Sequence, residues 1–411
     1  MSNEITDHSK APKLSHKRLT SLDGLRGIAV LSVVAFHTLR VTGHESLFGH
    51  VLNRVQESAW AGVDLFFVLS GFLITGILLD TRTSPSYFKT FFIRRFFRIF
   101  PLYYAVLAIA IVAVPSMVGP SHLPDLYPRL LENQGWLWTY TANYLQATGA
   151  HTLPGFGHFW SLAIEEQFYW FWPAVVYFAS RRKLFAICVA VCLFSPLLRL
   201  ILIEFGGVRE WAIRQYTFTR CDALLAGALA AVLLREPELL RKFRRAFAVA
   251  IGFSLAALTA IAVRNHYVPY EATETVVLGY SCLGVLFAAL VHRLATRGGR
   301  TAQLLSSSSL RWFGRYSYGI YLFHWPIAQA YRAALEPKLA RTFGAHFYSA
   351  EFAYVIVTCV SAVVAFVSWH AFEVRFIQLK EYFTYSRPER SEKPSAVSLE
   401  TKLPQLTGVN S

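Results

Sequence analysis

The residues of most obvious chemical interest are ionisable side chains within apolar segments. In the segment LDGLRGIAVLSVVAFHT, Arg26 lies near the N-terminal end and His37 follows eleven positions later. On a helix this separation is about 16 Å, because each residue adds about 1.5 Å. A neutral imidazole could act there as a general base that removes a proton from a hydroxyl group. The alternative is a structural histidine that is hydrogen-bonded to a neighbouring helix.

Carboxylates occupy comparable positions in three other segments. They are Asp64 in GVDLFFVLSGFLITG, Glu165 and Glu166 in HFWSLAIEEQFYWFWP, and Asp222 in TRCDALLAG. Ionisable groups inside a membrane are costly, so by default they indicate function. We expect Glu165 or Asp64 to orient the imidazole of His37, with helix capping as the alternative for Asp64. Arg220 and Asp222 are expected either to form an internal salt bridge or to contact an acceptor molecule.

Other polar residues have both a functional and a structural interpretation. Arg95 and Arg98 are three positions apart and share a helical face, and arginine forks bind phosphate oxygens well. The alternative is that both arginines set the orientation of the helix in the membrane and contact lipid headgroups. Ser70 and Gly71 are small enough either to permit close helix packing or to contact a ligand. His324 is interpreted either as a functional residue or as part of a helix kink. The sequence shows no group of cysteine, histidine and carboxylate residues with the spacing of a metal site.

The elements that must position these residues are expected to be membrane-spanning helices. The chain has 411 residues, of which 54% are hydrophobic and 16% are charged, whereas soluble proteins carry about a quarter charged residues. A bilayer core requires about 20 apolar residues per helix. The sequence therefore predicts an all-α, polytopic transmembrane bundle of about ten helices. The predicted spans are 23–42, 60–80, 98–118, 160–179, 184–203, 219–235, 246–264, 273–293, 316–335 and 352–374.

The distribution of basic residues predicts an orientation. With a cytoplasmic N-terminus, 29 of the 40 Lys and Arg residues fall in inside segments. Because cytoplasmic loops are enriched in Lys and Arg, this pattern favours an even number of helices with both termini inside. The net charge of +15 is therefore attributed to loops of a membrane protein, and no nucleic-acid partner is expected. We expect a polar cytoplasmic tail at 1–18, a transmembrane domain at 19–380 and a disordered cytoplasmic tail at 381–411.

Six blocks that contain these residues resemble, in order, the integral-membrane acyltransferase-3 family. They are LDGLRGIAVLSVVAFH, GVDLFFVLSGFLI, FFIRRFFRIFPLYY, HFWSLAIEEQFYWFWP, RCDALLAGALAA and RYSYGIYLFHWPI. Members of this family acylate bacterial surface sugars and related acceptors. The resemblance implies a multi-pass protein of the bacterial inner membrane, with lipid, acyl-CoA and a saccharide or glycolipid acceptor as its partners. It also implies that a second, extracytoplasmic step would be carried out by a separate protein.

The resemblance also assigns roles to individual residues. It implies that His37 is catalytic and that Glu165, rather than Glu166, is the acid of its segment. Arg26, Arg95, Arg98, Ser70 and Gly71 are expected to bind the acyl donor, and Glu166, Arg220, Asp222 and His324 the acceptor. No permanent cofactor is expected, since acyl-CoA acts as a co-substrate.

The expected activity is acyl transfer, most simply O-acetylation, from cytoplasmic acyl-CoA to a hydroxyl group at the periplasmic face. His37 would be either the base for direct transfer or a nucleophile that carries the acyl group. The alternative is a transporter or flippase of a lipid-linked saccharide, which a bundle with buried charges also permits. The sequence leaves the acceptor, the acyl chain length and the oligomeric state open.

Overall fold

The computed structural model describes residues 16–39, 53–54, 56–118, 127–149, 153–343 and 350–385, and every regular element within them is helical. Most of the predicted N-terminal tail and residues 386–411 of the predicted C-terminal tail lie outside this description. The major helices are α1 (His16–Thr38), α3 (Ala61–Thr81), α4 (Tyr87–Ala108), α8 (Trp160–Phe178), α9 (Arg181–Glu204), α11 (Thr217–Arg235), α13 (Arg244–Asn265), α14 (Tyr280–Thr296), α16 (Ser308–Ala330) and α18 (Ala350–Ser368).

Shorter helices connect or extend these elements. They are α5 (Val114–Val118), α6 (Tyr127–Trp138), α7 (Ala142–Ala147), α10 (Glu210–Ile213), α12 (Pro237–Lys242), α15 (Arg300–Leu305), α17 (Glu336–Phe343) and α19 (Val374–Leu379). Four π-helical turns extend major helices: Ile109–Ala113, Thr275–Gly279, Tyr331–Leu335 and Trp369–Glu373. Two 3₁₀ turns, Gly157–Phe159 and Lys380–Tyr382, complete the described elements.

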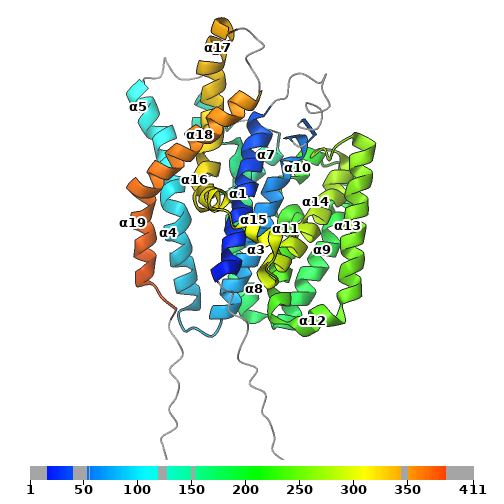
Figure 1. The fold of residues 1–411 in the computed structure, drawn as a ribbon. Coiled ribbons are helices and arrows are strands. Elements are labelled where there is room, and N and C mark those ends of the chain that lie inside the picture. Colours follow the sequence, from blue (N-terminus) through cyan, green and yellow to red (C-terminus); the bar gives the residue numbers. More distant parts are fainter. Residues whose placement is uncertain are drawn as a thin grey trace, which may run out of the picture.

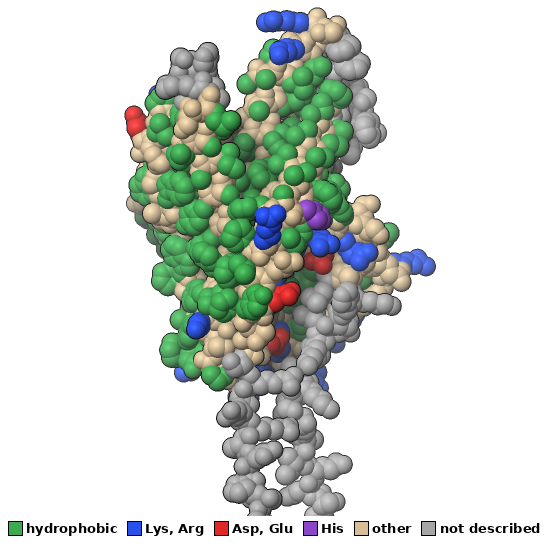
Figure 2. Space-filling view, turned by 90° about the vertical axis from the view of Figure 1, so that its left-hand side faces the viewer, with side chains coloured by type: hydrophobic (Ala, Val, Ile, Leu, Met, Phe, Trp, Pro, Cys, Tyr) green, Lys and Arg blue, Asp and Glu red, His purple; other side chains and the backbone are tan. Residues whose placement is uncertain are grey.

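A major helix lies at each of the ten predicted spans, which confirms the all-α polytopic class. Within the described residues, seven helical stretches are long and apolar enough to cross a membrane. Helices α1, α8 and α16 are not among them, and they carry five of the residues predicted to be functional: Arg26, His37, Glu165, Glu166 and His324. On the face formed by α4, α5, α18 and α19, hydrophobic side chains cover most of the surface (Figure 2), as expected for contact with lipid.

Helix α4 starts earlier than predicted. The predicted span begins at residue 98, but α4 already begins at Tyr87 and includes the clustered arginines. Arg95 and Arg98 are therefore placed on a helix whose inner surface lines the bundle. The connection that follows α5 contains the short helix α6.

Two pairs of helices touch through their backbones. A methyl group added at Gly71 of α3 would lie 1.8 Å from the carbonyl oxygen of Leu224 in α11. A methyl group added at Gly314 of α16 would likewise lie 1.8 Å from the carbonyl oxygen of Asp23 in α1. Glycine permits such approach because it has no side chain. These contacts fix α1 against α16 and α3 against α11.

The arrangement in Figure 1 places α1 and α3 in the middle of the bundle. Helices α9, α11, α13 and α14 lie on one side, and α4, α18 and α19 lie on the other. Helices α7 and α10 lie near one end of the bundle and α12 near the opposite end (Figure 1). We call the end with α7 and α10 the outer end and the end with α12 the inner end, following the predicted orientation.

Candidate active site

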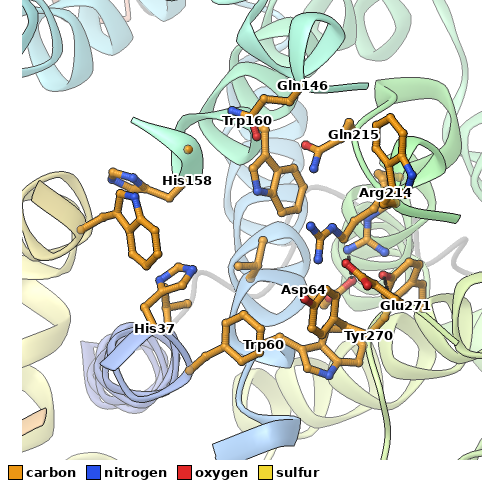
Figure 3. A pocket seen from close by; sticks show the side chains of 18 of the residues that line it. His37, Trp60, Asp64, Gln146, His158, Trp160, Arg214, Gln215, Tyr270 and Glu271 are labelled. Carbon is orange, nitrogen blue, oxygen red and sulfur yellow. Dashed lines mark hydrogen bonds and ion pairs between the residues drawn. The ribbon is translucent and has the colours of Figure 1, made fainter. Parts of the chain in front are cut away.

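A cavity of about 670 Å³ lies toward the outer end of the bundle, and we call it the outer cavity. Its walls come from the last turns of α1, the first turns of α3 and α8, and the segments before α11 and α14 (Figure 3). A volume of about 300–1,000 Å³ is typical of small-molecule sites. The lining residues with polar or aromatic side chains include His37, Trp60, Asp64, Gln146, His158, Trp160, Trp211, Arg214, Gln215, Arg220, Tyr270, Glu271 and Trp325.

The imidazole of His37 is held in one tautomer by a second imidazole. Nδ1 of His37 lies 2.9 Å from Nε2 of His324, and Nδ1 of His324 lies 2.6 Å from the carbonyl oxygen of Tyr321. Because a carbonyl oxygen only accepts, Nδ1 of His324 carries a proton and Nε2 of a neutral His324 is an acceptor. Nδ1 of His37 must therefore donate. Nε2 of His37 is left without a proton and is available as a base or nucleophile.

Neighbouring side chains restrict the position of this ring. The indole of Trp325 lies 4.5 Å from the His37 ring, and the ring of His158 packs edge-on at 4.9 Å from His324. Arg332 donates a hydrogen bond to the carbonyl oxygen of His37, at the end of α1. His324 is fully buried behind His37. It thus supports the imidazole, and it does not itself line the outer cavity as an acceptor ligand.

The carboxylates predicted to orient His37 have other partners. Asp64 accepts a hydrogen bond from Nη2 of Arg220 at 2.7 Å, and the start of α3 has no side-chain cap. Glu165 accepts hydrogen bonds from Ser70 at 3.0 Å and from Tyr169 at 3.3 Å. The physical reason is that a buried carboxylate is stabilised most by a guanidinium within reach, and Arg220 of α11 faces Asp64 directly.

Arg220 and Asp222 do not form the predicted internal salt bridge. Asp222 pairs instead with Arg199 of α9 and accepts a hydrogen bond from Ser281. Residues two apart on a helix point in different directions, so Arg220 faces α3 and the outer cavity while Asp222 faces α9 and α14. Arg199 is fully buried. Asp222 is therefore part of a structural ion pair away from the outer cavity.

Two small cavities continue from the outer cavity toward the inner end. The first, of about 60 Å³, shares Val63 and Tyr321 with the outer cavity. The second, of about 70 Å³, shares Arg26, Ser70, Leu162, Glu165 and Tyr318 with the first. Because each cavity shares wall residues with the next, the three are neighbours and lie one after another in the bundle. Ser70 and Glu165 lie at the junction of the two small cavities.

The predicted donor-binding arginines line the inner end of this series. Arg26, Arg95 and Arg98 all line the cavity of about 70 Å³. The guanidinium of Arg95 stacks on Tyr169 at 4.1 Å, and its Nε is buried without a hydrogen-bond partner. Arg94, by contrast, donates to carbonyl oxygens of the segment after α19 and does not line the cavity. Arg94 is thus a structural residue, whereas Arg95 and Arg98 face the interior of the bundle.

The remaining predicted residues also separate by position. Ser70 faces the small cavities, whereas Gly71 packs against Leu224 and lines none of the three cavities. The geometry therefore supports the close-packing interpretation for Gly71 and leaves ligand contact for Ser70. Glu166 lines the cavity of about 70 Å³, which we call the inner cavity, beside Arg95 and Arg98. The acceptor, in contrast, is expected in the outer cavity.

Several lining residues of the outer cavity were missed by the sequence analysis. They are Trp60, Gln146, His158, Trp160, Arg214 and Gln215. Most of them lie in or beside connections between helices, where no periodicity marks a functional side chain. His158 and Trp160 do occur in the block HFWSLAIEEQFYWFWP, so their position next to two acidic residues was an available signal.

Comparison with known proteins decides the family. The family described as an acyltransferase domain matches residues 19–370, which is most of the chain. The chain belongs to this acyltransferase family. The predicted resemblance is therefore confirmed, and the chain is a multi-pass membrane protein of the acyltransferase family by its family match and its apolar helices.

Characterised members of the acyltransferase family share moderate identity with this chain. It is 31% identical over 346 residues to peptidoglycan O-acetyltransferase OatA of Listeria monocytogenes, which covers 80% of this chain and 52% of that protein. It is 26% identical over 342 residues to O-acetyltransferase OatA of Staphylococcus aureus, covering 79% of this chain and 53% of that protein. The chain thus spans about half the length of these relatives. No solved structure matches.

Proposed function

We propose that this acyltransferase transfers an acyl group, most simply acetyl, from cytoplasmic acyl-CoA to a hydroxyl group of a saccharide or glycolipid. The acceptor would occupy the outer cavity, at the periplasmic face of the inner membrane. The observation that carries the proposal is the hydrogen bond between His37 and His324 at the wall of the outer cavity, next to a series of smaller cavities of which the last is lined by three arginines. Relatives named as O-acetyltransferases support acetyl as the transferred group.

The inner arginines suit the phosphates of a CoA ester. Guanidinium groups bind phosphate oxygens with paired hydrogen bonds, and Arg26, Arg95 and Arg98 surround one small cavity. Ser70, already bonded to Glu165, lies where the two small cavities join. A thioester arm that entered this series from the arginines would be directed toward the outer cavity and His37.

Two routes follow for His37. In the direct route, Nε2 accepts the acceptor's hydroxyl proton while the hydroxyl oxygen attacks the thioester carbonyl; the C–S bond breaks, and the CoA thiolate leaves and takes up a proton. In the two-step route, Nε2 attacks the thioester carbonyl and the thiolate leaves. The acceptor hydroxyl oxygen then attacks the acyl carbonyl, the bond between that carbon and Nε2 breaks, the imidazole is released, and the hydroxyl proton passes to the CoA thiolate. In both routes His324 accepts the hydrogen bond from Nδ1 and stabilises the positive charge that develops on the imidazole.

The outer cavity suits a sugar. Four tryptophans line it, and their flat apolar faces can pack on sugar rings. They are Trp60, Trp160, Trp211 and Trp325. Nε2 of Gln146 and Oε1 of Gln215 are buried without hydrogen-bond partners in the same cavity. Buried polar groups are normally satisfied, so these atoms indicate a ligand with several hydroxyl or amide groups. Peptidoglycan, named for the relative from Listeria monocytogenes, is one acceptor of this chemistry.

The test replaces His37 in the purified full-length chain. With labelled acetyl-CoA and saccharide acceptors in proteoliposomes, we expect His37→Ala to lower the transfer rate by at least about a hundredfold, the scale of general acid–base catalysis. His370→Ala is the matched control, because His370 is exposed and lines none of the three cavities. This variant should retain the wild-type rate. Transfer at the wild-type rate by a correctly folded His37→Ala protein would falsify the proposal.

A further inference from the structure

The outer cavity contains a cation that forms no ion pair with any described carboxylate. Arg214 follows the short helix α10 and lines the wall of the cavity opposite His37 (Figure 3). Its guanidinium carbon lies 4.6 Å from the ring centre of Tyr270 and 5.9 Å from that of Trp160. Its Nε is buried without a hydrogen-bond partner. Among the described residues, Arg214 forms no ion pair.

The surrounding rings hold this side chain in place. Stacking on aromatic faces is favourable for a guanidinium and leaves its N–H edges free to bind in the plane. Burial of part of a charged group without a partner is costly unless a ligand supplies the opposite charge. The arrangement therefore matches that of a binding residue that awaits an anionic oxygen.

The other charged residues of the outer cavity do not serve as that partner. Asp64 is engaged by Arg220 at 2.7 Å, and the guanidinium of Arg220 stacks on Tyr280 at 3.8 Å. Glu271 also lines the cavity, but its side chain is exposed and forms no ion pair with Arg214. The pair of Asp64 and Arg220 is thus internally neutral, and Glu271 remains at the solvent-accessible edge.

We propose that Arg214 binds an anionic substituent of the acceptor, a carboxylate or a phosphate, so that the preferred acceptor is an acidic or phosphorylated saccharide. This inference rests on the proposed function, since it concerns the acceptor of the same reaction. Arg214 lies across the cavity from His37 (Figure 3). An acceptor held by its anionic group at Arg214 and packed on the tryptophans would extend its neutral part toward the imidazole. Arg214 would then determine which sugar is presented and which hydroxyl lies near Nε2.

Direct binding tests this subsite without any transfer reaction. The purified full-length protein in detergent micelles, without acyl donor, is titrated with galactotriose, trigalacturonate, maltotriose and phosphorylated maltotriose while tryptophan fluorescence is recorded. We expect each anionic sugar to bind at least about tenfold more tightly than its neutral counterpart, the scale of one charge-assisted hydrogen-bonded pair. Arg214→Gln should abolish this preference and leave binding of the neutral sugars unchanged.

A second variant separates a specific site from general charge. Glu271→Gln removes a negative charge from the same cavity and should leave the preference intact or increase it. Arg214→Lys keeps the charge without the planar fork and should keep only part of the preference. Equal binding of anionic and neutral sugars by the wild-type protein would overturn the proposal, as would an unchanged preference in Arg214→Gln.

The transfer assay distinguishes this inference from the proposed function. If anionic sugars bind through Arg214 but no sugar accepts label from acetyl-CoA, the subsite stands and the acyl-transfer proposal fails. If label is transferred equally to neutral and anionic sugars, the acyltransferase proposal stands and the anionic subsite is refuted. A preference for only the carboxylate or only the phosphate identifies which anion the acceptor carries.

Discussion

At the scale of single residues, the main difference between expectation and structure concerns the partner of His37. The sequence indicates a buried imidazole and nearby acids, and the natural inference is a histidine–carboxylate pair. In the structure, Nδ1 of His37 is instead hydrogen-bonded to Nε2 of His324, and Nδ1 of His324 donates to a backbone carbonyl oxygen. Contacts between residues almost 300 positions apart depend on how the helices pack, so they could not be predicted from one sequence.

His324 should therefore act as a positioning residue for His37. Replacement by Leu removes the acceptor for Nδ1–H and releases the tautomer, so we expect kcat to fall roughly 10–100-fold, as for other partners that orient a reacting group. The KM for acyl-CoA should not change, because His324 does not line the inner cavity. His324→Gln, whose amide oxygen can accept the bond, should recover part of the rate. Equal rates for the Leu and Gln variants would contradict this role.

The three neighbouring arginines offer an internal comparison for donor binding. Arg95→Gln and Arg98→Gln should each raise the KM for acyl-CoA about tenfold or more, because each removes a charge-assisted contact to phosphate. Arg94→Gln is the control, since Arg94 bonds to backbone carbonyls outside the cavity. Steady-state kinetics with varied acyl-CoA measures the effect. A similar rise in KM for all three variants would indicate general surface charge and not a built site.

At the scale of helices, the sequence was informative where hydrophobicity is continuous and misleading where polar residues interrupt it. Helices α13 and α18 have long apolar segments without internal charges and lie where they were predicted. The predicted span 98–118 leaves out the arginine-rich start of α4, because charge normally marks a membrane boundary. There the interior face of the bundle is polar, so a helix continues through charges that a lipid-facing helix would exclude.

Close backbone contact makes a specific element-scale prediction. Gly71→Ala places a methyl group 1.8 Å from the Leu224 carbonyl oxygen and must separate α3 from α11. We expect a loss of stability of at least about 1–3 kcal/mol, the usual cost of overpacking. Thermal unfolding in detergent, followed by size-exclusion chromatography, measures it.

The matched control for Gly71 is another glycine within a helix. At Gly252 of α13, an added methyl group meets no atom within 4 Å. Gly252→Ala should leave stability unchanged or raise it by about 0.5–1 kcal/mol, because alanine favours the helix. If Gly71→Ala were as stable as Gly252→Ala, the close contact between α3 and α11 would be wrong.

At the scale of the whole molecule, the series of cavities gives the bundle a direction. Arg26, Arg95 and Arg98 line one end of the series, and His37 with the tryptophan-rich cavity lies at the other. The basic residues of the connecting segments predict that the arginine end is cytoplasmic. The charge distribution thus predicts an orientation from the sequence alone, whereas the cavities depend on how the helices pack.

This orientation predicts which positions are accessible from each side of the membrane. Arg182, at the start of α9, and Glu271, at the edge of the outer cavity, are both exposed and belong to opposite ends of the bundle. In a protein from which the five native cysteines have been removed, cysteine at 271 should react with a membrane-impermeant maleimide in spheroplasts. Cysteine at 182 should react only in inverted vesicles. The reverse pattern would place the arginines outside, away from cytoplasmic acyl-CoA. Labelling of both positions from one side would refute the assignment of the outer cavity and the start of α9 to opposite membrane faces.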